Sequence, residues 1–97
     1  MTDDPKELSS ADLRRALTRR ERERMMRGDF RSGADIKALR RFTGLSQTRF
    51  AEALGISVHT LRNWEQDRRT PEGPALALLR VVARHPRVVY ENLAPSV

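Results

Sequence analysis

Residues 44–65 read GLSQTRFAEALGISVHTLRNWE, and this stretch decides the fold of the chain. Its apolar residues recur three or four positions apart on either side of Gly55, which is the spacing of two short amphipathic helices. Gly55 has no Cβ atom, so it takes the positive φ angle of a tight reversal at little cost. Ala51, four residues earlier, is small enough to let the second helix approach the first closely. The stretch therefore predicts two helices that meet at roughly a right angle.

The second helix of this pair has polar side chains on the face that turns away from Leu61 and Trp64. A helix that enters the major groove of DNA by its N-terminal half offers such a face to the base edges. Arginine recognises guanine and asparagine recognises adenine through paired hydrogen bonds, and a small apolar side chain contacts the thymine methyl group. We expect at least two of four candidates to contact bases, namely Val58, His59, Arg62 and Asn63.

The starts of both helices, and the residues after the second one, are candidates for phosphate contact. Free backbone N–H groups and the helix dipole favour an anion at a helix N-terminus, and arginines hold a phosphate by charge. These candidates are Ser46, Gln47, Ser57, Thr60, Arg68 and Arg69. Ser46 and Ser57 also belong to the residue types that cap a helix N-terminus, so we expect both to do so.

The rest of residues 34–97 also has helical apolar spacing, and no window alternates apolar and polar residues as a half-buried strand does. Glycine at position 44 is expected to end one helix, and proline at position 86 follows the end of another. We therefore predict an all-α domain over residues 34–97 with five helices. They cover about 35–42, 47–54, 58–67, a span from 71–74 to 85, and 86–93.

Residues 1–33 differ in composition, with nine lysines or arginines against seven acidic residues and few apolar side chains. We expect a separate N-terminal arm, which is either one helix over about residues 10–26 whose thin apolar stripe needs something to pack on, or a frayed, flexible segment. Residues 28–33 are expected to link the arm to the domain, because Gly28 and Gly33 interrupt the helical pattern.

The overall composition favours a nucleic-acid partner and argues against an enzyme. The net charge is +6, and a basic balance favours polyanions. There is no cysteine, and His59 and His85 lie on separate predicted helices, so we expect no catalytic pair, no metal and no cofactor. No apolar run approaches the roughly 20 residues of a membrane span. We therefore expect no membrane partner and a cytoplasmic location.

The C-terminal helices have more apolar side chains than one helix face can hold. Such a surplus is exposed in a small monomer and is covered when two copies form a symmetric dimer. The residues expected at this contact are Leu76, Val88, Val89, Tyr90 and Leu93. The alternative is that the same side chains complete the core of a monomer.

Six positions fall at the spacing of a known motif: Gln47, Ala51, Gly55, Leu61, Trp64 and Glu65. Through them, residues 35–70 resemble the Xre-type helix-turn-helix of phage repressors. The resemblance implies a five-helix, lambda-repressor-like fold that binds a double-stranded DNA operator. It also implies a buried structural ion pair between Arg40 in the first helix of the domain and Glu65 at the end of the third.

Three segments narrow the resemblance: residues 61–66 read LRNWEQ, residues 69–74 read RTPEGP, and residues 75–80 read ALALLR. With them, residues 36–93 resemble the HigA-like antitoxins. The resemblance implies a dimer that neutralises a small ribonuclease toxin of the RelE/HigB type and represses its own operon. In some of these proteins a segment before the DNA-binding domain wraps the toxin. Here the matching toxin contacts would be Leu13, Leu17, Met25, Met26 and Phe30.

Two other functions remain open at the level of sequence. One is a stand-alone repressor of the phage type with no toxin partner. The other is a protein-interaction module whose helix pair packs only against protein. A neighbouring gene for one small protein favours the antitoxin, and a lack of salt-dependent DNA affinity favours the interaction module.

Overall fold

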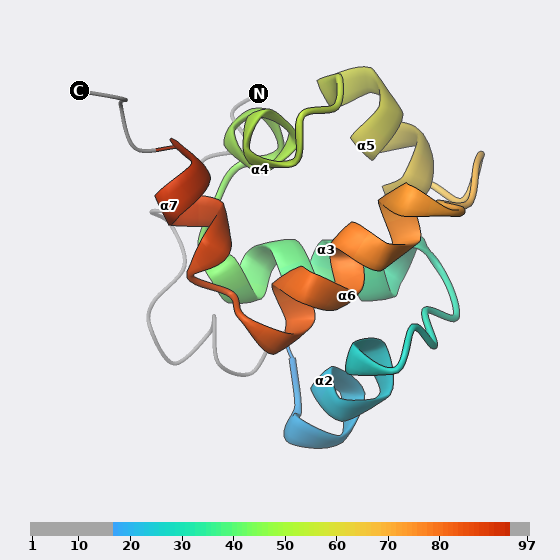
Figure 1. Cartoon of the computed structure of the whole chain (residues 1–97). Coiled ribbons are helices and arrows are strands. Elements are labelled where there is room, and N and C mark those ends of the chain that lie inside the picture. The colour runs from blue at the N-terminus through green and yellow to red at the C-terminus, as the bar shows by residue number, and fades with distance from the viewer. Residues whose placement is uncertain (1–16, 94–97) are drawn as a thin grey trace.

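The computed structural model describes residues 17–93. Within this range the chain forms six helices and no strand. In chain order (Figure 1) they are α2 (Arg19–Met26), α3 (Gly33–Thr43), α4 (Gln47–Leu54), α5 (Val58–Glu65), α6 (Pro74–Arg84) and α7 (Val88–Leu93). The last five are the helices predicted for the domain, so the all-α, five-helix expectation is confirmed.

Local signals set the ends of α4 and α5. The Ser46 hydroxyl accepts a hydrogen bond from the Arg49 N–H at 3.2 Å, and the Ser57 hydroxyl accepts one from the Thr60 N–H at 3.0 Å. Gly55 follows α4 with a φ angle of 71°, in the left-handed region that favours glycine. The two predicted caps and the glycine turn are therefore confirmed.

The helices pack around one shared core. Helix α2 packs on α6, α3 packs on α5, and α4 packs on both α5 and α7. Figure 1 shows α4 and α5 on one side of the molecule and α2 on the other, with α3 and α6 between them. Every helix contributes a fully buried side chain, and the largest are Met25, Ile36, Leu39, Phe50, Leu61, Leu79, Val82 and Val89. This core holds α5 in a defined orientation.

Gly33 allows the start of α3 to lie against the end of α5. A Cβ atom here would lie 2.3 Å from the carbonyl oxygen of Trp64 and 2.4 Å from that of Glu65, far inside van der Waals contact. The Gly33 N–H also donates to Asp67 Oδ1 at 2.7 Å. The sequence predicts a linker at this position, whereas the structure shows a close approach of two backbones.

Helix α2 is shorter than the predicted helix over residues 10–26. The Thr18 hydroxyl accepts from the Glu21 N–H at 3.1 Å, and the Glu21 carboxylate accepts from the Thr18 N–H at 2.9 Å. These reciprocal bonds form a capping box, which starts α2 at Arg19. A helix that continues through Thr18 is therefore wrong, and residues 10–16 lie outside the described part of the chain.

The described part of the predicted arm packs on the rest of the molecule. Arg22 donates from Nε to the carbonyl of Ala83 at 2.8 Å. Leu17 and Met25 are buried in the same core as the later helices. Residues 17–33 therefore belong to one packed unit with α3–α7, because α6 covers the thin apolar stripe that looked insufficient in isolation.

Candidate nucleic-acid interface

Helix α5 is fixed against α4 by buried side chains and a short turn. Leu61 and Trp64 point into the core and are buried. The chain reverses at Gly55, and the Ile56 N–H donates to the Ala51 carbonyl at 3.1 Å. Figure 1 shows α5 at the edge of the molecule. The face of α5 opposite its buried residues is therefore a surface of defined orientation.

The four predicted base-reading residues all lie on α5 but differ in exposure. His59 and Arg62 are exposed, whereas Val58 and Asn63 are half-buried. Val58 packs against the core, so only part of its side chain reaches the surface. His59 and Arg62 are thus the more accessible members of this set.

A buried ion pair joins α3 to the end of α5. Arg40 Nε lies 2.8 Å from Glu65 Oε2, and the two side chains are only 5% and 3% exposed. A second bond joins Arg40 Nη2 to Glu65 Oε1 at 3.2 Å, and Arg40 Nη1 donates to the Leu45 carbonyl at 3.1 Å. Two bonds in a fixed fork set the orientation of Glu65 as well as its position.

Gln47, at the first position of α4, extends this pair to the surface. Its Nε2 donates to Glu65 Oε1 at 2.9 Å, and its Oε1 accepts from Arg62 Nε at 3.0 Å. The sequence predicts Gln47 as a phosphate contact only. The bond to Arg62 is a feature that sequence reasoning missed, because the two residues lie on different helices whose angle must be known.

The predicted phosphate contacts at the two helix starts are also part of the caps. The Ser57 hydroxyl lies 2.9 Å from the Thr60 hydroxyl and accepts the Thr60 N–H. The Ser46 hydroxyl accepts the Arg49 N–H. These three hydroxyls therefore stabilise the helix starts in the structure as it stands.

The predicted phosphate contacts after α5 are exposed cations on an anchored loop. Arg68 and Arg69 are exposed, and their backbone N–H groups donate to the Asn63 carbonyl at 2.9 and 3.3 Å. Asp67 makes the turn with a φ angle of 61°. The loop is thus tied to the same helix that carries the candidate base-reading residues.

A second buried ion pair, which sequence reasoning missed, joins α2 to α3. Arg24 Nη1 lies 2.7 Å from Asp35 Oδ2, and Arg24 Nη2 lies 3.2 Å from Oδ1. Each side chain is 11% exposed. The signal in the sequence is that Asp35 stands directly before Ile36 and four residues before Leu39, on the apolar face of α3.

The surroundings of Asp35 keep this pair charged. Burial alone would raise the pKa of Asp35, but hydrogen bonds from the Arg24 guanidinium and the Arg31 N–H, with the charges of both arginines, outweigh it and lower the pKa. The hydrogen bond to Asp35 raises the pKa of Arg24 in turn, against the effect of burial. The pair therefore remains ionised at neutral pH.

The residues predicted for a dimer contact separate into two kinds. Val89 is buried in the core, which corrects its assignment to an exposed contact, because α7 turns it towards α4. Tyr90 is 50% exposed, and its hydroxyl donates to the Thr43 carbonyl. Leu76, Val88 and Leu93 are half-buried. Part of the apolar surplus thus completes the core, and the rest remains accessible.

The residues predicted for toxin contact also separate. Leu17 and Met25 are core residues, which corrects their assignment to a surface contact, because packing on the rest of the molecule covers both. Met26 and Phe30 are half-buried and pack against the edge of that core. Leu13 lies outside the described residues.

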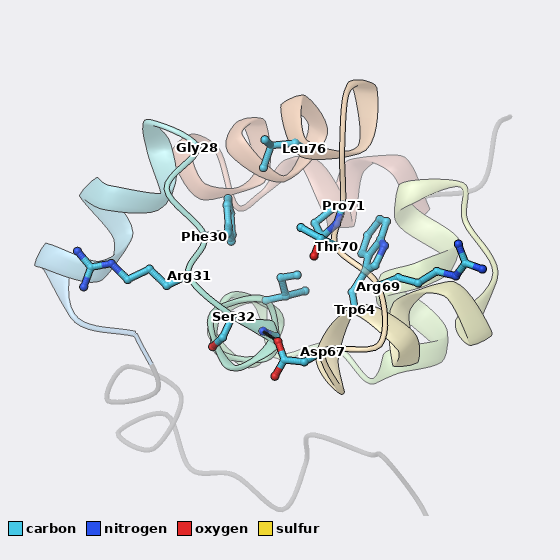
Figure 2. A pocket seen from close by; sticks show the side chains of 12 residues that line it. Gly28, Phe30, Arg31, Ser32, Trp64, Asp67, Arg69, Thr70, Pro71 and Leu76 are labelled. Carbon is cyan, nitrogen blue, oxygen red and sulfur yellow. Dashed lines mark hydrogen bonds between the residues drawn. The ribbon is translucent and has the colours of Figure 1, made fainter.

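A small cavity lies between the segment before α3, the loop after α5 and the start of α6 (Figure 2). Its volume is about 120 Å³, less than the roughly 300 Å³ at which small-molecule sites begin. Its apolar lining comes from Phe30, Ile36, Trp64, Pro71 and Leu76. The cavity is large enough for a few water molecules or one side chain.

Two other kinds of feature are absent from the described residues. Between residues 17 and 93 there is no group of three or more histidine, aspartate or glutamate side chains placed to hold a metal ion. None of the six helices described is both long enough and apolar enough to cross a membrane.

Comparison with known proteins agrees with this architecture. A family model described as a helix-turn-helix domain matches residues 32–90. Antitoxin HigA-2 of Vibrio cholerae is 42% identical over 55 residues, which make up 57% of this chain and 53% of that protein. The uncharacterized HTH-type transcriptional regulator YiaG of Escherichia coli is 38% identical over 55 residues, 57% of either chain.

This chain spans about half the length of the curated relatives that it matches. No solved structure matches it. The matched range of the family model covers α3 to α7 and more than half of the chain. The chain therefore belongs to the Xre-type family of helix-turn-helix domains.

Proposed function

We propose that this DNA-binding helix-turn-helix regulator reads a specific operator through α5 and represses transcription from it. The observation that carries the proposal is the arrangement of α5. Leu61 and Trp64 fix it to the core, the Arg40–Glu65 pair anchors its end, and His59 and Arg62 remain exposed on its outer face. A rigid helix with an exposed polar face suits the major groove.

Phosphate contacts in this proposal come from the two ends of the helix pair. Arg68 and Arg69 supply charge beyond α5, and the starts of α4 and α5 supply backbone N–H groups beside Gln47 and Ser57. Phosphate contacts set the register of the protein on the duplex, and base contacts give the specificity.

We further propose that two copies bind a palindromic operator whose half-sites lie roughly 34 Å apart, one turn of B-DNA. The accessible apolar side chains Leu76, Val88, Tyr90 and Leu93 support a symmetric contact between the C-terminal helices. Contact at these positions is supported by their partial exposure alone, so the stoichiometry on DNA is the decisive measurement.

We also propose that the chain is an antitoxin. It is supported by the 42% identity to antitoxin HigA-2 over 55 residues. The partner would be a ribonuclease toxin of the RelE/HigB type, and the chain itself would act as a non-enzymatic inhibitor in the cytoplasm. Among the described residues, Met26 and Phe30 at the edge of the core are the remaining candidates for this contact, together with Leu13 from the sequence.

A gel-shift titration of the full chain on the DNA upstream of its own gene, at several salt concentrations, tests the DNA function. Asn63→Ala should cost roughly 1–3 kcal/mol at one base position, whereas Arg69→Ala should weaken all sequences alike and reduce the salt dependence. The absence of a sequence-selective shift at moderate salt would contradict the proposal.

A second candidate is a stand-alone repressor with no toxin partner, which the similarity to the HTH-type transcriptional regulator YiaG favours. Co-expression of the chain with the product of the adjacent gene separates the two. Co-purification and relief of growth arrest support the antitoxin, whereas selective DNA binding without any such complex supports the stand-alone repressor.

A further inference from the structure

A chain of hydrogen bonds connects the core of the molecule to the outer face of α5. It begins at the buried Arg40 guanidinium, continues through the Glu65 carboxylate and the Gln47 amide, and ends at the exposed side chain of Arg62. Arg62 is a candidate base-reading residue, so this chain links a structural ion pair to a side chain that faces outward.

Two hydrogen-bond partners of Gln47, Glu65 and Arg62, set the orientation of its amide. The Glu65 carboxylate is paired with the Arg40 guanidinium and accepts hydrogen bonds, so the Gln47 nitrogen must face it. Arg62 Nε carries a hydrogen and can only donate, so the Gln47 oxygen must face it. Because both requirements agree, the acceptor offered to Arg62 is fixed from inside the protein.

This acceptor restricts a side chain that is otherwise long and flexible. An unrestrained arginine side chain loses much of its rotamer entropy when it is immobilised. Within the described residues, Arg62 is held through Nε alone, so its two Nη nitrogens keep their hydrogens for another acceptor. Those nitrogens form the fork that binds the O6 and N7 atoms of guanine.

We propose that Gln47 is a positioning residue that determines how sharply Arg62 distinguishes one base pair. The inference rests on the proposed function, since it requires that α5 reads bases. It goes beyond a phosphate contact at Gln47, because a phosphate contact strengthens binding to all sequences equally. A phosphate contact at Gln47 would therefore change the affinity for every duplex, whereas positioning of Arg62 changes the discrimination at one base pair.

The test uses the full chain and a DNA duplex that the wild-type protein selects from a randomised pool. Affinity is measured for this duplex and for versions with each base pair changed in turn. Four variants are compared: Gln47→Met, Gln47→Lys, Arg62→Ala and the double variant Gln47→Met with Arg62→Ala. Gln66→Met makes the same chemical change at an exposed glutamine at the end of α5 and is the control.

Arg62→Ala is expected to remove about 5- to 150-fold of discrimination at one base pair, the range for a bidentate contact. Gln47→Met should reduce discrimination at that same base pair by about 3- to 10-fold, a part of the same range, and leave the other positions unchanged. The double variant should resemble Arg62→Ala there, because Gln47 acts through Arg62. Gln66→Met should resemble the wild type.

Gln47→Lys is included because it keeps a hydrogen-bond donor to Glu65 and should therefore fold. It also distinguishes a role in positioning Arg62 from a role in contacting phosphate. A lysine ammonium still donates to Glu65, but it offers Arg62 no acceptor and repels its charge. We expect higher affinity for every duplex, because the lysine adds a cation near the phosphate backbone of DNA. We also expect weaker discrimination at the base pair that Arg62 reads. Uniformly higher affinity with unchanged discrimination would show a phosphate role alone and would overturn the inference.

Nuclear magnetic resonance of the free protein supplies a measurement that needs no DNA. Exchange of the Arg62 Nε–H with water should be several-fold slower in the wild type than in Gln47→Met. Equal exchange in both proteins overturns the inference, as does a Gln47→Met variant that weakens all duplexes equally. A wild-type protein that selects no sequence overturns the proposed function first, and the inference with it.

Discussion

Two buried ion pairs in this molecule, Arg24–Asp35 and Arg40–Glu65, have the same geometry but different further hydrogen-bond partners. Arg24 near the end of α2 and Arg40 near the end of α3 each donate to a carbonyl five residues ahead, that of Asp29 or of Leu45. Each then binds a carboxylate on another helix through two bonds. In each pair, the arginine therefore binds both the turn that follows its own helix and a second helix.

The difference lies beyond the carboxylate. Asp35 accepts one further bond, from the backbone N–H of Arg31, and no other side chain between residues 17 and 93 bonds to its carboxylate. Glu65 accepts one further bond from the side chain of Gln47, whose other end holds Arg62 on the surface. The comparison teaches that the same ion-pair chemistry serves packing alone at α2, and packing together with the orientation of a surface side chain at α5.

The largest expected effect comes from Glu65→Gln. This change leaves the Arg40 guanidinium buried without its carboxylate, so the free energy of unfolding should fall by about 3–5 kcal/mol. Urea unfolding of the full chain measures it. The control is Glu52→Gln, which breaks an exposed pair with Arg49 and should change stability by less than about 1 kcal/mol. Equal losses in the two variants would show that the buried pair is not an anchor.

Asp35→Asn should destabilise the protein by about 3 kcal/mol, at the low end for a broken buried pair, because Arg24 is slightly more exposed than Arg40. At temperatures where the variant is folded, its discrimination between DNA sequences should equal that of the wild type. Binding measurements on a matched and a mismatched duplex check this. Altered discrimination in the folded variant would break the distinction between the two pairs.

Thr18→Ala should cost about 1 kcal/mol, the usual value for the loss of an N-cap. The change removes the hydroxyl that accepts the Glu21 N–H at the start of α2. Thermal unfolding measures the loss, and Thr48→Ala, at an exposed threonine on α4, serves as the control. A loss of DNA affinity in folded Thr18→Ala would connect α2 to the reading face and contradict the comparison.

The smallest effect is the acid dependence of the α2 pair. The pKa of Asp35 is lower in the folded than in the unfolded chain, so the unfolded chain binds more protons as the pH falls. The stability from this pair is complete above the unfolded pKa of about 3.9, and it is lost as the pH falls through the folded pKa. The gap in stability between wild type and Asp35→Asn should therefore narrow below about pH 4. A gap that stays constant would contradict the shift.

The sequence was sufficient for the helix pair because its signals are local. Ser46 and Ser57 cap helices that start at the next residue, and Gly55 turns the chain through its own backbone angle. Such features depend on a few neighbouring residues, so they can be recognised without knowing which helices meet. The five-helix order of the domain followed from the same kind of signal.

The missed features all depend on which helices meet. The apolar surplus of α7 has the same appearance in a sequence whether it covers a core, as Val89 does, or a partner. Met25 looked like an arm residue because nothing nearby in sequence covers it, whereas its helix α2 packs on α6, which begins 49 positions later. The Arg24–Asp35 pair likewise requires the angle between α2 and α3 to be known.

Gly33 has a consequence for any survey of substitutions in this protein. Gly33 carries no charge and lies at the start of α3, away from the outer face of α5. Any side chain at this position would nevertheless collide with the backbone carbonyls at the end of α5. A selection that scores DNA binding across all single substitutions should therefore show position 33 to be as intolerant as the exposed arginine of the reading helix. Position 33 would be intolerant because a side chain there displaces α5, whereas the arginine would be intolerant because it contacts DNA. Measuring the folding of each variant in parallel distinguishes these two causes.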